Sequence, residues 1–429
     1  MSLKMKTDVN SVPRVSPFRT KNKARTLTAE ALLNTESSTK IDEAELSLKQ
    51  LSIKGLLSFG EETIFEFGRL NLLIGPNGSG KSNLLNCIRV LRLAPLDIQQ
   101  AFQDSGFEDW LFKGAALNSA SLQAKLNAPE SICHRLRFLP QSTTRVALEE
   151  VISQGESDHP TSPLFIGSYR GKTTLSAVGK RRRINRNLNV DEYNPLASIL
   201  SQIRDASQYP EITHLAALYS QFRIYSEWTF GRTSKLREAT PTSRTTATLS
   251  ESMDDLALAL NGLEKTAAHE AIRILLRELK ETYVDYITRI LFGRVGLELL
   301  ESPFESPLPA QRLSDGTLRF LALAAILFQP KPPPLICLEE PELGMHPDMI
   351  RMVAKMIIDA ASRTQLIVTT HSEQLLSSLQ DDFDALFAFD TGVNGTVVRR
   401  FSQSDYSDWR DEHTLGQLWT SGELGGNRW

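Results

Sequence analysis

The chain has 429 residues, enough for two or three domains, and its 41% hydrophobic and 23% charged residues are close to the averages of folded proteins. This composition provides a sizeable core and excludes collagen-like, globally disordered and disulfide-scaffold proteins. Because the net charge is -3, nucleic acid would have to bind through local basic patches.

The cysteines and the apolar stretches indicate where the protein resides. Cys87, Cys133 and Cys337 are far apart and match no zinc-binding pattern, so we expect reduced thiols. The longest apolar stretch, residues 318–328, contains Arg319 and is much shorter than the roughly 20 residues that span a bilayer. The first ten residues lack the apolar core of a secretory signal. We therefore expect a cytoplasmic protein with no membrane partner.

The N-terminal part of the chain changes from a polar tail to regular structure. Residues 1–45 are polar and carry an excess of basic over acidic side chains before Thr26, which predicts a basic disordered tail. Three short β-type runs follow between residues 46 and 74. From Lys81 the apolar residues recur at helical spacing, which predicts a helix that ends before Pro95.

The middle of the chain has weaker patterns. A helical stretch is expected at residues 101–112, followed by four candidate strands between residues 121 and 169 that indicate an antiparallel meander. Residues 231–252 are rich in Thr, Ser and Arg and predict a loop. Residues 254–291 carry apolar residues at helical spacing, up to and including Ile287 and Ile290, so we expect a helical lobe there.

The last third of the chain alternates between helical and strand patterns. The expected order is a helix at 316–328, a strand at 334–339, a helix at 347–361, a strand at 365–370, a helix from Ser372, and a hairpin over 385–401 with an Asn-Gly turn. Such alternation predicts a mostly parallel sheet covered by helices.

A phosphate-binding loop lies between the third predicted strand and the helix that follows it. The residues are Gly75, Pro76, Asn77, Gly78, Ser79, Gly80, Lys81 and Ser82, with Asn83 next to them. They satisfy the pattern G-x-x-x-x-G-K-[ST], in which backbone N–H groups surround the phosphates of a nucleotide. We expect Lys81 to reach the β- and γ-phosphates and Ser82 to bind Mg²⁺. A guanine-specific N-K-x-D motif is missing from the sequence, which favours ATP over GTP.

Three further segments supply the other expected parts of an ATPase site. The apolar strand at 334–339 ends in Glu339 and Glu340, of which the first is expected to hold Mg²⁺ and the second to activate water. At residues 313–317 (LSDGT, the signature segment), Ser314 and Gly316 begin a helix whose N-terminus suits a phosphate. His371 follows a buried strand, where it would contact the γ-phosphate or the water.

Taken together, these motifs resemble the ATP-binding cassette superfamily. Residues 313–330 followed by 338–347 are similar, more narrowly, to stand-alone bacterial ATPases of the RecF and SMC group, which includes the ATPase parts of OLD nucleases and of anti-phage systems. The resemblance implies an α/β P-loop NTPase of ABC-ATPase type, with a mixed sheet, an antiparallel β subdomain and an inserted helical lobe. The expected division is 46–130 and 305–429 for the ATPase head and 131–304 for the insertion.

The resemblance also implies a mechanism. Two heads of this group dimerise head to tail and enclose ATP, so Ser314, Asp315 and Gly316 are expected to contact the γ-phosphate held by the partner. Glu340 would be the general base, His371 the switch histidine and residues 343–347 a dimer contact. Asp315 departs from the usual glycine and brings a negative charge toward phosphate. Glu339 stands where aspartate is usual, so Mg²⁺ contact through a water is expected.

The glutamine that couples the nucleotide to the inserted lobe stays unassigned between Gln123 and Gln141. Two biological roles also remain open. The first is an ATP-dependent switch that acts on DNA in repair or anti-phage defence, through the basic N-terminal tail and the basic cluster of Lys180, Arg181, Arg182, Arg183 and Arg186. A solvated surface is the alternative interpretation of that cluster. The second role is the sensor ATPase of a two-component toxin or nuclease system that binds a protein effector. A transporter subunit is disfavoured, because the stretch between the P-loop and the signature segment is longer than such subunits have.

Overall fold

The computed structural model describes residues 47–114, 120–127, 131–155, 164–169, 172–178, 183–188, 192–244, 248–407 and 412–425. The predicted basic tail at 1–45 lies outside the described residues, and so do Lys180, Arg181 and Arg182 of the basic cluster. Cys87, Cys133 and Cys337 are buried free thiols, as expected. None of the helices in the described ranges has the length and apolar character needed to cross a membrane.

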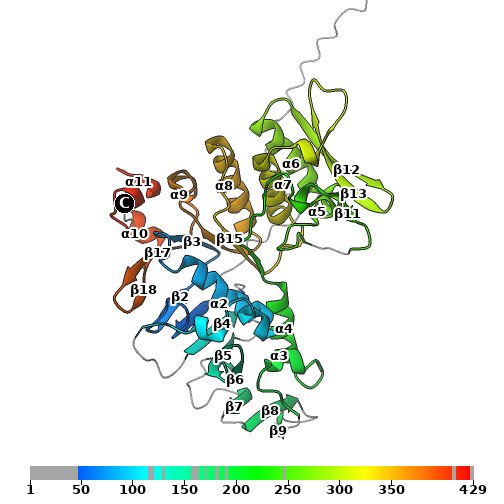
Figure 1. The fold of residues 1–429 in the computed structure, drawn as a ribbon. Coiled ribbons are helices and arrows are strands. Elements are labelled where there is room, and N and C mark those ends of the chain that lie inside the picture. The colour runs from blue at the N-terminus through cyan, green and yellow to red at the C-terminus, as the bar shows by residue number, and fades with distance from the viewer. Residues whose placement is uncertain are drawn as a thin grey trace, which may run out of the picture.

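A six-stranded sheet forms the centre of the molecule (Figure 1). Its strand order is β10 (Arg223–Tyr225), β15 (Leu335–Glu339), β16 (Gln365–Thr369), β3 (Leu70–Ile74), β17 (Ala385–Gly392) and β18 (Gly395–Phe401). All neighbouring strands are parallel except the β17–β18 hairpin. This confirms the predicted sheet, and it puts β3, from the N-terminal part of the chain, between two strands from the C-terminal part.

Helices cover both faces of this sheet, so its strands are apolar on both sides. One face packs on α2 (Lys81–Leu93) and α4 (Pro210–Gln221), with Leu73 and Ile367 in the shared core. The other packs on α7 (Asp315–Leu327), α8 (Pro347–Ala361) and α9 (Glu373–Leu379), with Leu72 and Val368 in the core. Leu72 and Leu73 are adjacent and both fully buried, as a strand between two helical layers requires.

An eight-stranded antiparallel sheet contains the predicted meander. The order is β2 (Thr63–Glu66), β1 (Gln50–Lys54), β4 (Ala120–Asn127), β5 (Ser131–Pro140), β6 (Val146–Gln154), β7 (Leu164–Tyr169), β8 (Lys172–Val178) and β9 (Arg183–Leu188). In β4, buried and partly exposed residues alternate, which is the pattern of a strand with one face on a core. The expected division at residue 130 falls between β4 and β5, which pair in this sheet, and it stays a prediction.

The lobe at upper right in Figure 1 combines helices with a small sheet. It contains α5 (Leu256–Leu263), α6 (Ala267–Leu279), and the strands β11 (Thr240–Pro241), β12 (Tyr283–Leu291), β13 (Arg294–Glu301) and β14 (Leu308–Pro309). The prediction of helix through Ile287 and Ile290 is therefore wrong. The segment is rich in β-branched and aromatic residues, and Phe292 and Gly293, both with positive φ, form the turn that returns the chain as β13.

Smaller elements complete the chain. The expected helix at 101–112 is replaced by two short 3-10 helices, Ile98–Phe102 and Phe107–Trp110, with Gly106 at positive φ between them. Two more 3-10 helices occur at Lys235–Arg237 and Ala310–Arg312. The other short helices are α3 (Ile199–Gln202), α10 (Gln403–Ser407) and α11 (Leu415–Thr420).

Candidate nucleotide-binding site

The P-loop, residues 75–82, connects the end of β3 to the start of α2. Gly75, Gly78 and Gly80 have φ values of 144, 78 and 110°, which L side chains rarely adopt. A Cβ on Gly75 would lie 2.4 Å from the backbone oxygen of Phe389, and one on Gly80 would lie 2.4 Å from Thr396 Oγ1. The β17–β18 hairpin therefore packs against the loop so closely that glycine is required at both positions.

Lys81 lies across the loop. Its Nζ donates hydrogen bonds to the backbone oxygens of Gly75 at 2.7 Å and Pro76 at 2.9 Å. Burial lowers the pKa of Lys81 to about 8, and the carboxylates of Glu340 and Glu339 oppose this shift. The ammonium group is thus charged at neutral pH and held against the backbone of the loop.

Ser82 and Glu339 come together although they are distant in sequence. Ser82 Oγ donates a hydrogen bond to Glu339 Oε1. Hydroxyl and carboxylate oxygens are ligands that Mg²⁺ accepts, so the pair fits a magnesium site completed by phosphate and water. Ser79 Oγ is buried with no hydrogen-bond partner among the described residues, which fits a ligand in the loop. Asn83 instead turns away, and its Nδ2 donates to Ser58 Oγ at 2.8 Å.

Glu340 and His371 lie at the ends of neighbouring strands. Glu339 is paired with Thr369 in the parallel register of β15 and β16, so the residues after each strand meet at one edge. Glu340 has a φ of 45°, in a sparsely populated region, and its N–H donates to the backbone oxygen of Thr369 at 3.1 Å. His371 Nε2 is 3.4 Å from Glu340 Oε1.

The imidazole of His371 is uncharged at neutral pH. Burial lowers its pKa to about 4, and the positive charge of Lys81 acts in the same direction. The contact with Glu340 is therefore one between a neutral ring and a carboxylate rather than an ion pair. Nε2 has no hydrogen-bond partner among the described residues. A neutral ring with a free nitrogen beside a carboxylate suits the orientation of a water or phosphate oxygen.

Glu342 is a site residue that the sequence did not reveal. Its Oε1 accepts hydrogen bonds from Thr370 Oγ1 at 2.5 Å and from the backbone N–H of His371 at 3.0 Å. Burial raises the pKa of Glu342, and these hydrogen bonds oppose the shift. The side chain fixes the backbone that carries His371. Nothing in the hydropathy pattern distinguishes this glutamate from an exposed one; the signal available was its position two residues after Glu340.

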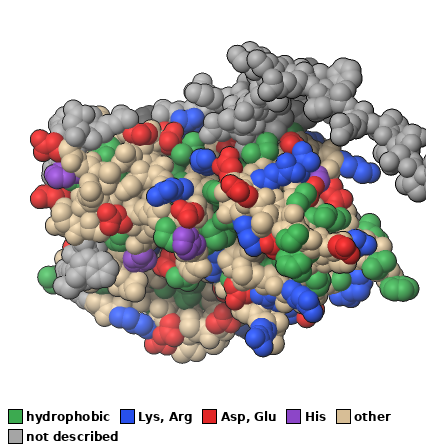
Figure 2. Space-filling model, turned by 90° about the horizontal axis from the view of Figure 1, so that it is seen from above, with side chains coloured by type: hydrophobic (Ala, Val, Ile, Leu, Met, Phe, Trp, Pro, Cys, Tyr) green, Lys and Arg blue, Asp and Glu red, His purple; other side chains and the backbone are tan. Residues whose placement is uncertain are grey.

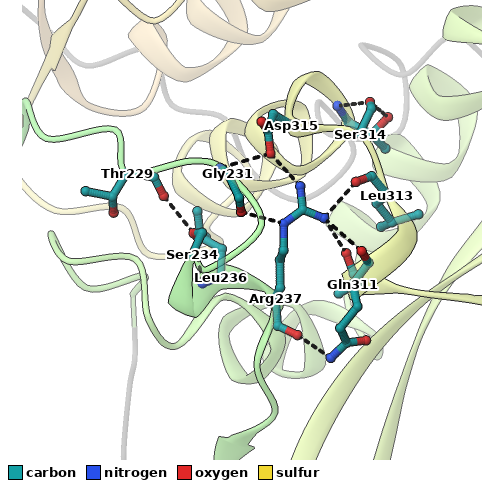
Figure 3. A network of polar contacts seen from close by, with 11 residues as sticks. Thr229, Gly231, Ser234, Leu236, Arg237, Gln311, Leu313, Ser314 and Asp315 are labelled. Atoms are coloured by element: carbon teal, nitrogen blue, oxygen red, sulfur yellow. Dashed lines mark hydrogen bonds and ion pairs between the residues drawn. The ribbon is translucent and has the colours of Figure 1, made fainter.

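The signature segment caps α7, the helix on the second face of the sheet (Figure 3). Ser314 Oγ accepts a hydrogen bond from the N–H of Thr317 at 3.1 Å, as an N-cap does. Asp315, whose side chain is 51% exposed, forms an ion pair with Arg237 and accepts a hydrogen bond from the N–H of Gly231 at 3.1 Å. The hydrogen bonds of Ser314 and Asp315 thus run within α7 and to residues 231–237, rather than to the P-loop of the same chain.

Aromatic and cationic side chains connect helix α7 to the end of β15. Trp228 Nε1 donates to the backbone oxygen of Glu339 at 2.5 Å. The Arg319 guanidinium lies 4.5 Å from the ring centre of Phe230 and 5.2 Å from that of Trp228, within reach of cation–π attraction. Burial lowers the pKa of Arg319 to about 10, opposed by Glu342 and other nearby carboxylates, so it stays charged at neutral pH.

The remaining predicted residues lie elsewhere. Gln123 is on β4, where its Oε1 accepts from Arg135 at 2.7 Å, and Gln141 is in the turn between β5 and β6. The described members of the basic cluster are on β9, each with a carboxylate: Arg183 pairs with Glu211 and Arg186 with Glu192. Leu343, in the expected dimer-contact segment 343–347, is 57% exposed.

A protein-family model matches residues 70–128 and 142–377 of the chain. Its description is "AAA domain, putative AbiEii toxin, Type IV TA system". The two matched ranges contain the P-loop, the signature segment, Glu339, Glu340 and His371.

Individual relatives fall into two groups. A "Chromosome partition protein Smc" from Desulfitobacterium hafniense (strain Y51) is 37% identical over 164 residues, which cover 33% of this chain and 13% of that protein. An "ATP/GTP phosphatase" from Helicobacter pylori (strain ATCC 700392 / 26695) is 20% identical over 351 residues, 77% of this chain and 87% of that protein. The matches to Smc proteins thus span about one eighth of their length.

A solved structure has the same fold. The crystal structure of "the SmcHead bound to the C-winged helix domain of ScpA" superposes with a TM-score of 0.54 and 16% identity, and it covers 83% of this chain and 99% of that chain. This likeness confirms the expected ABC-type fold with its mixed and antiparallel sheets.

Proposed function

The chain belongs to the AAA domain family described above, as an ATPase with the fold of an Smc head, and from this premise we propose that it is an ATP-driven switch. In this proposal two copies associate head to tail, and each P-loop faces the signature segment of the other copy. ATP binding joins the heads and hydrolysis releases them. The observation that carries the proposal is that Ser314 and Asp315 form no hydrogen bond with the P-loop of their own chain. Their hydrogen bonds are to α7 and to residues 231–237.

The proposed roles follow from the contacts around the loop. Lys81 binds the β- and γ-phosphates, and Ser82 and Glu339 hold Mg²⁺, either directly or through a water. When bound, Mg²⁺ neutralises phosphate charge. Glu340 accepts the proton of the attacking water, and neutral His371 orients the water or a phosphate oxygen next to it. Ser314 and Gly316 supply the helix N-terminus that meets the phosphate of the partner copy.

For the output of the switch, we infer a protein effector, as in a two-component toxin or nuclease system. The family description names a toxin of a Type IV toxin–antitoxin system, which supports this inference. The charge distribution supports it as well. Arg183 and Arg186 are already paired with carboxylates, and on the face seen in Figure 2 the Lys and Arg side chains are interspersed with Asp and Glu.

Action on DNA, in repair or in defence, is the second candidate. The observation that favours it is the 37% identity with a chromosome partition protein over 164 residues. In this alternative the basic N-terminal tail and the cluster of Lys180, Arg181, Arg182, Arg183 and Arg186 contact DNA phosphates, which would make the stimulation by DNA sensitive to salt.

The substitution Glu340→Gln tests the switch directly. It retains the size of the side chain but removes the proton acceptor, so hydrolysis should fall by about 100-fold or more and the ATP-bound dimer should accumulate. Size-exclusion chromatography with light scattering, with ATP, GTP or no nucleotide and with or without duplex DNA, measures this. Lys81→Ala is the control, because it should stay monomeric under every condition.

The outcomes separate the alternatives. An ATP-bound monomer of the Glu340→Gln variant would contradict the head-to-tail switch. A DNA-dependent rise in the ATPase rate of the native protein, lost at high salt, would favour the DNA role over the protein effector. An equal response to GTP would contradict the preference for ATP that the missing N-K-x-D motif predicts.

A further inference from the structure

Residues 226–238, which we call the bracing segment, connect two parts of the proposed ATPase. In the proposed dimer, one part serves the nucleotide bound to the same copy and the other part serves the nucleotide bound to the partner copy. At one end Trp228 is hydrogen-bonded to the backbone of Glu339, in the chain's own magnesium site. At the other end Gly231 and Arg237 contact the signature segment, which serves the partner's nucleotide in the proposed dimer (Figure 3). The sequence predicted only a loop at residues 231–252, which overlaps the second half of this segment.

Arg237 is the centre of this contact. Its guanidinium donates to the backbone oxygens of Ala310 at 2.9 Å and Leu313 at 2.7 Å, and to that of Gly231 at 2.8 Å. Its third nitrogen, Nη2, donates to the carboxylate of Asp315. The arginine is 7% exposed, so its bonds to the backbone oxygens form away from bulk water, where charge-assisted hydrogen bonds are strong, whereas its contact with the half-exposed Asp315 reaches the surface. One side chain thus fixes both the path of residues 310–313 and the position of the first carboxylate of α7.

The charge of Asp315 explains why such a contact matters. This carboxylate lies between Ser314 and Gly316, the residues that should approach a nucleotide carrying several negative charges. A free carboxylate at this place would repel the phosphate, whereas a carboxylate bound to a guanidinium presents little net charge. The side chain is half exposed on the outer side, so the pair lies at the surface where the partner head would dock.

We propose that Arg237 is a positioning residue that cancels the charge of Asp315, so that the signature segment can accept the phosphate of a partner-bound ATP. The inference rests on the proposed head-to-tail dimer. The bracing segment keeps the guanidinium in place, because Trp228 is anchored on Glu339 and Arg319 lies against the rings of Trp228 and Phe230. Arg237 itself touches no nucleotide.

The test uses variants of the full chain in the Glu340→Gln background, where the dimer accumulates. Arg237→Gln retains hydrogen-bond donors but leaves Asp315 with its charge, so the ATP concentration for half-maximal dimer should rise by about tenfold or more. Adding Asp315→Asn should restore dimerisation to within about threefold, because the repulsive charge is gone. Arg289→Gln is the matched control, because it removes an ion pair with Glu298 between β12 and β13. It should leave dimerisation unchanged.

Two further readouts distinguish charge cancellation from a merely structural role. Binding of a fluorescent ATP analogue to the monomer should be the same in Arg237→Gln as in the parent, because the P-loop is untouched. The defect should also shrink at high salt, where the Debye length falls to about 3 Å at 1 M. A variant that lost the shape of the loop would respond neither to salt nor to the second substitution.

The possible results are distinguishable. If the Glu340→Gln parent forms no ATP-dependent dimer, both the head-to-tail switch and the role of Arg237 are wrong. If the parent dimerises and Arg237→Gln dimerises equally well, the role of Arg237 alone is wrong. A defect that Asp315→Asn fails to rescue would overturn charge cancellation. Circular dichroism and thermal unfolding confirm that each variant is folded. Should Arg237→Gln not fold, Arg237→Lys replaces it: lysine keeps the positive charge, so charge cancellation requires dimerisation within about threefold of the parent, and a loss of about tenfold or more would contradict it.

Discussion

Two titratable side chains at the nucleotide site have pKa values on opposite sides of neutrality. The pKa of Lys81 is lowered to about 8 and that of His371 to about 4, in both cases mainly by burial. At pH 7 the lysine is therefore charged and the histidine neutral. A charged histidine next to Lys81 would add repulsion between cations, so partial burial gives the two side chains different charges and different roles.

Lys81 gives the first pH prediction. Above pH 8 its ammonium group loses its proton in the free protein, so ATP should bind more weakly, approaching tenfold per pH unit. Below pH 8 the affinity should be constant down to the region where ATP itself is protonated. The dissociation constant of a fluorescent ATP analogue, measured between pH 6.5 and 9.5, tests this. Lys81→Arg is the control: it should bind less tightly but show no loss above pH 8, since arginine stays charged. A flat profile for the native protein would contradict the prediction.

At the scale of single residues, the sequence revealed the side chains that belong to local patterns. The P-loop and the pair Glu339–Glu340 have fixed spacing within one segment, and the structure brings Ser82 and Glu339 into contact. Arg237, Trp228 and Glu342 were missed because their partners are remote in sequence: Arg237 binds Asp315 across a span that contains α5, α6 and the strands β11 to β14. An arginine in a loop rich in Ser and Thr belongs to no periodic pattern from which such a contact could be predicted.

Among the elements, the β17–β18 hairpin supports the P-loop. Thr396 Oγ1 lies 2.8 Å from the backbone oxygen of Ser79 and 2.7 Å from Ser58 Oγ, and Ser58 in turn binds Asn83. The hairpin therefore connects both the loop and the start of α2 to the antiparallel sheet near β1. Its turn residue Gly395, with a φ of 106°, allows the close approach to Ser58.

Thr396→Val tests this support. The substitution retains the shape but removes the hydroxyl, so the oxygen of Ser79 loses its partner and the free energy of unfolding should fall by about 1–3 kcal/mol. ATP affinity should fall several-fold as the loop loosens. Chemical denaturation and titration with the fluorescent ATP analogue measure the two effects. Val397→Thr, at an exposed position on the same strand, should alter neither. Unchanged ATP affinity in Thr396→Val would show that the hairpin does not position the loop.

The elements also show where periodicity is informative. From α7 to β18 the predicted order of helices and strands agrees with the structure, because alternating amphipathic helices and fully apolar strands have distinct patterns. In β12 the pattern gave a wrong prediction. Ile287 and Ile290 are three residues apart, as on one face of a helix, but they lie in a half-exposed strand. The β-branched and aromatic content from Tyr283 onward was the better guide.

In the whole molecule, a buried polar network joins the antiparallel sheet to the helices next to the ATPase sheet. Glu150 on β6 accepts from Ser198 Oγ at 2.7 Å and from the N–H of Ile199 at 2.8 Å, at the start of α3. It also lies 2.8 Å from Nε2 of His134, whose Nδ1 is 3.1 Å from the hydroxyl of Tyr219 on α4. Helix α4 shares a core with α2, so this network links the meander to the P-loop helix.

Glu150→Ala should therefore destabilise the whole fold. Three buried groups lose their acceptor at once, and breaking such a network typically costs about 3–5 kcal/mol. The midpoint of urea unfolding, followed by circular dichroism, measures the loss. Glu270→Ala, which removes an exposed ion pair with Arg273 on α6, should cost about 0–1 kcal/mol. Equal midpoints for the two variants would refute the structural role of the network.

The position of β3 has a consequence for synthesis on the ribosome. This strand carries the P-loop, yet both of its neighbours, β16 and β17, are encoded about 300 residues later. At roughly 5–20 residues per second, translation leaves its two edges without partners for roughly 15–60 s. Exposed strand edges invite pairing with other chains. The P-loop strand of the nascent protein thus gains its place in the sheet only after β16 and β17 have been synthesised, and until then both of its edges are open to wrong pairing.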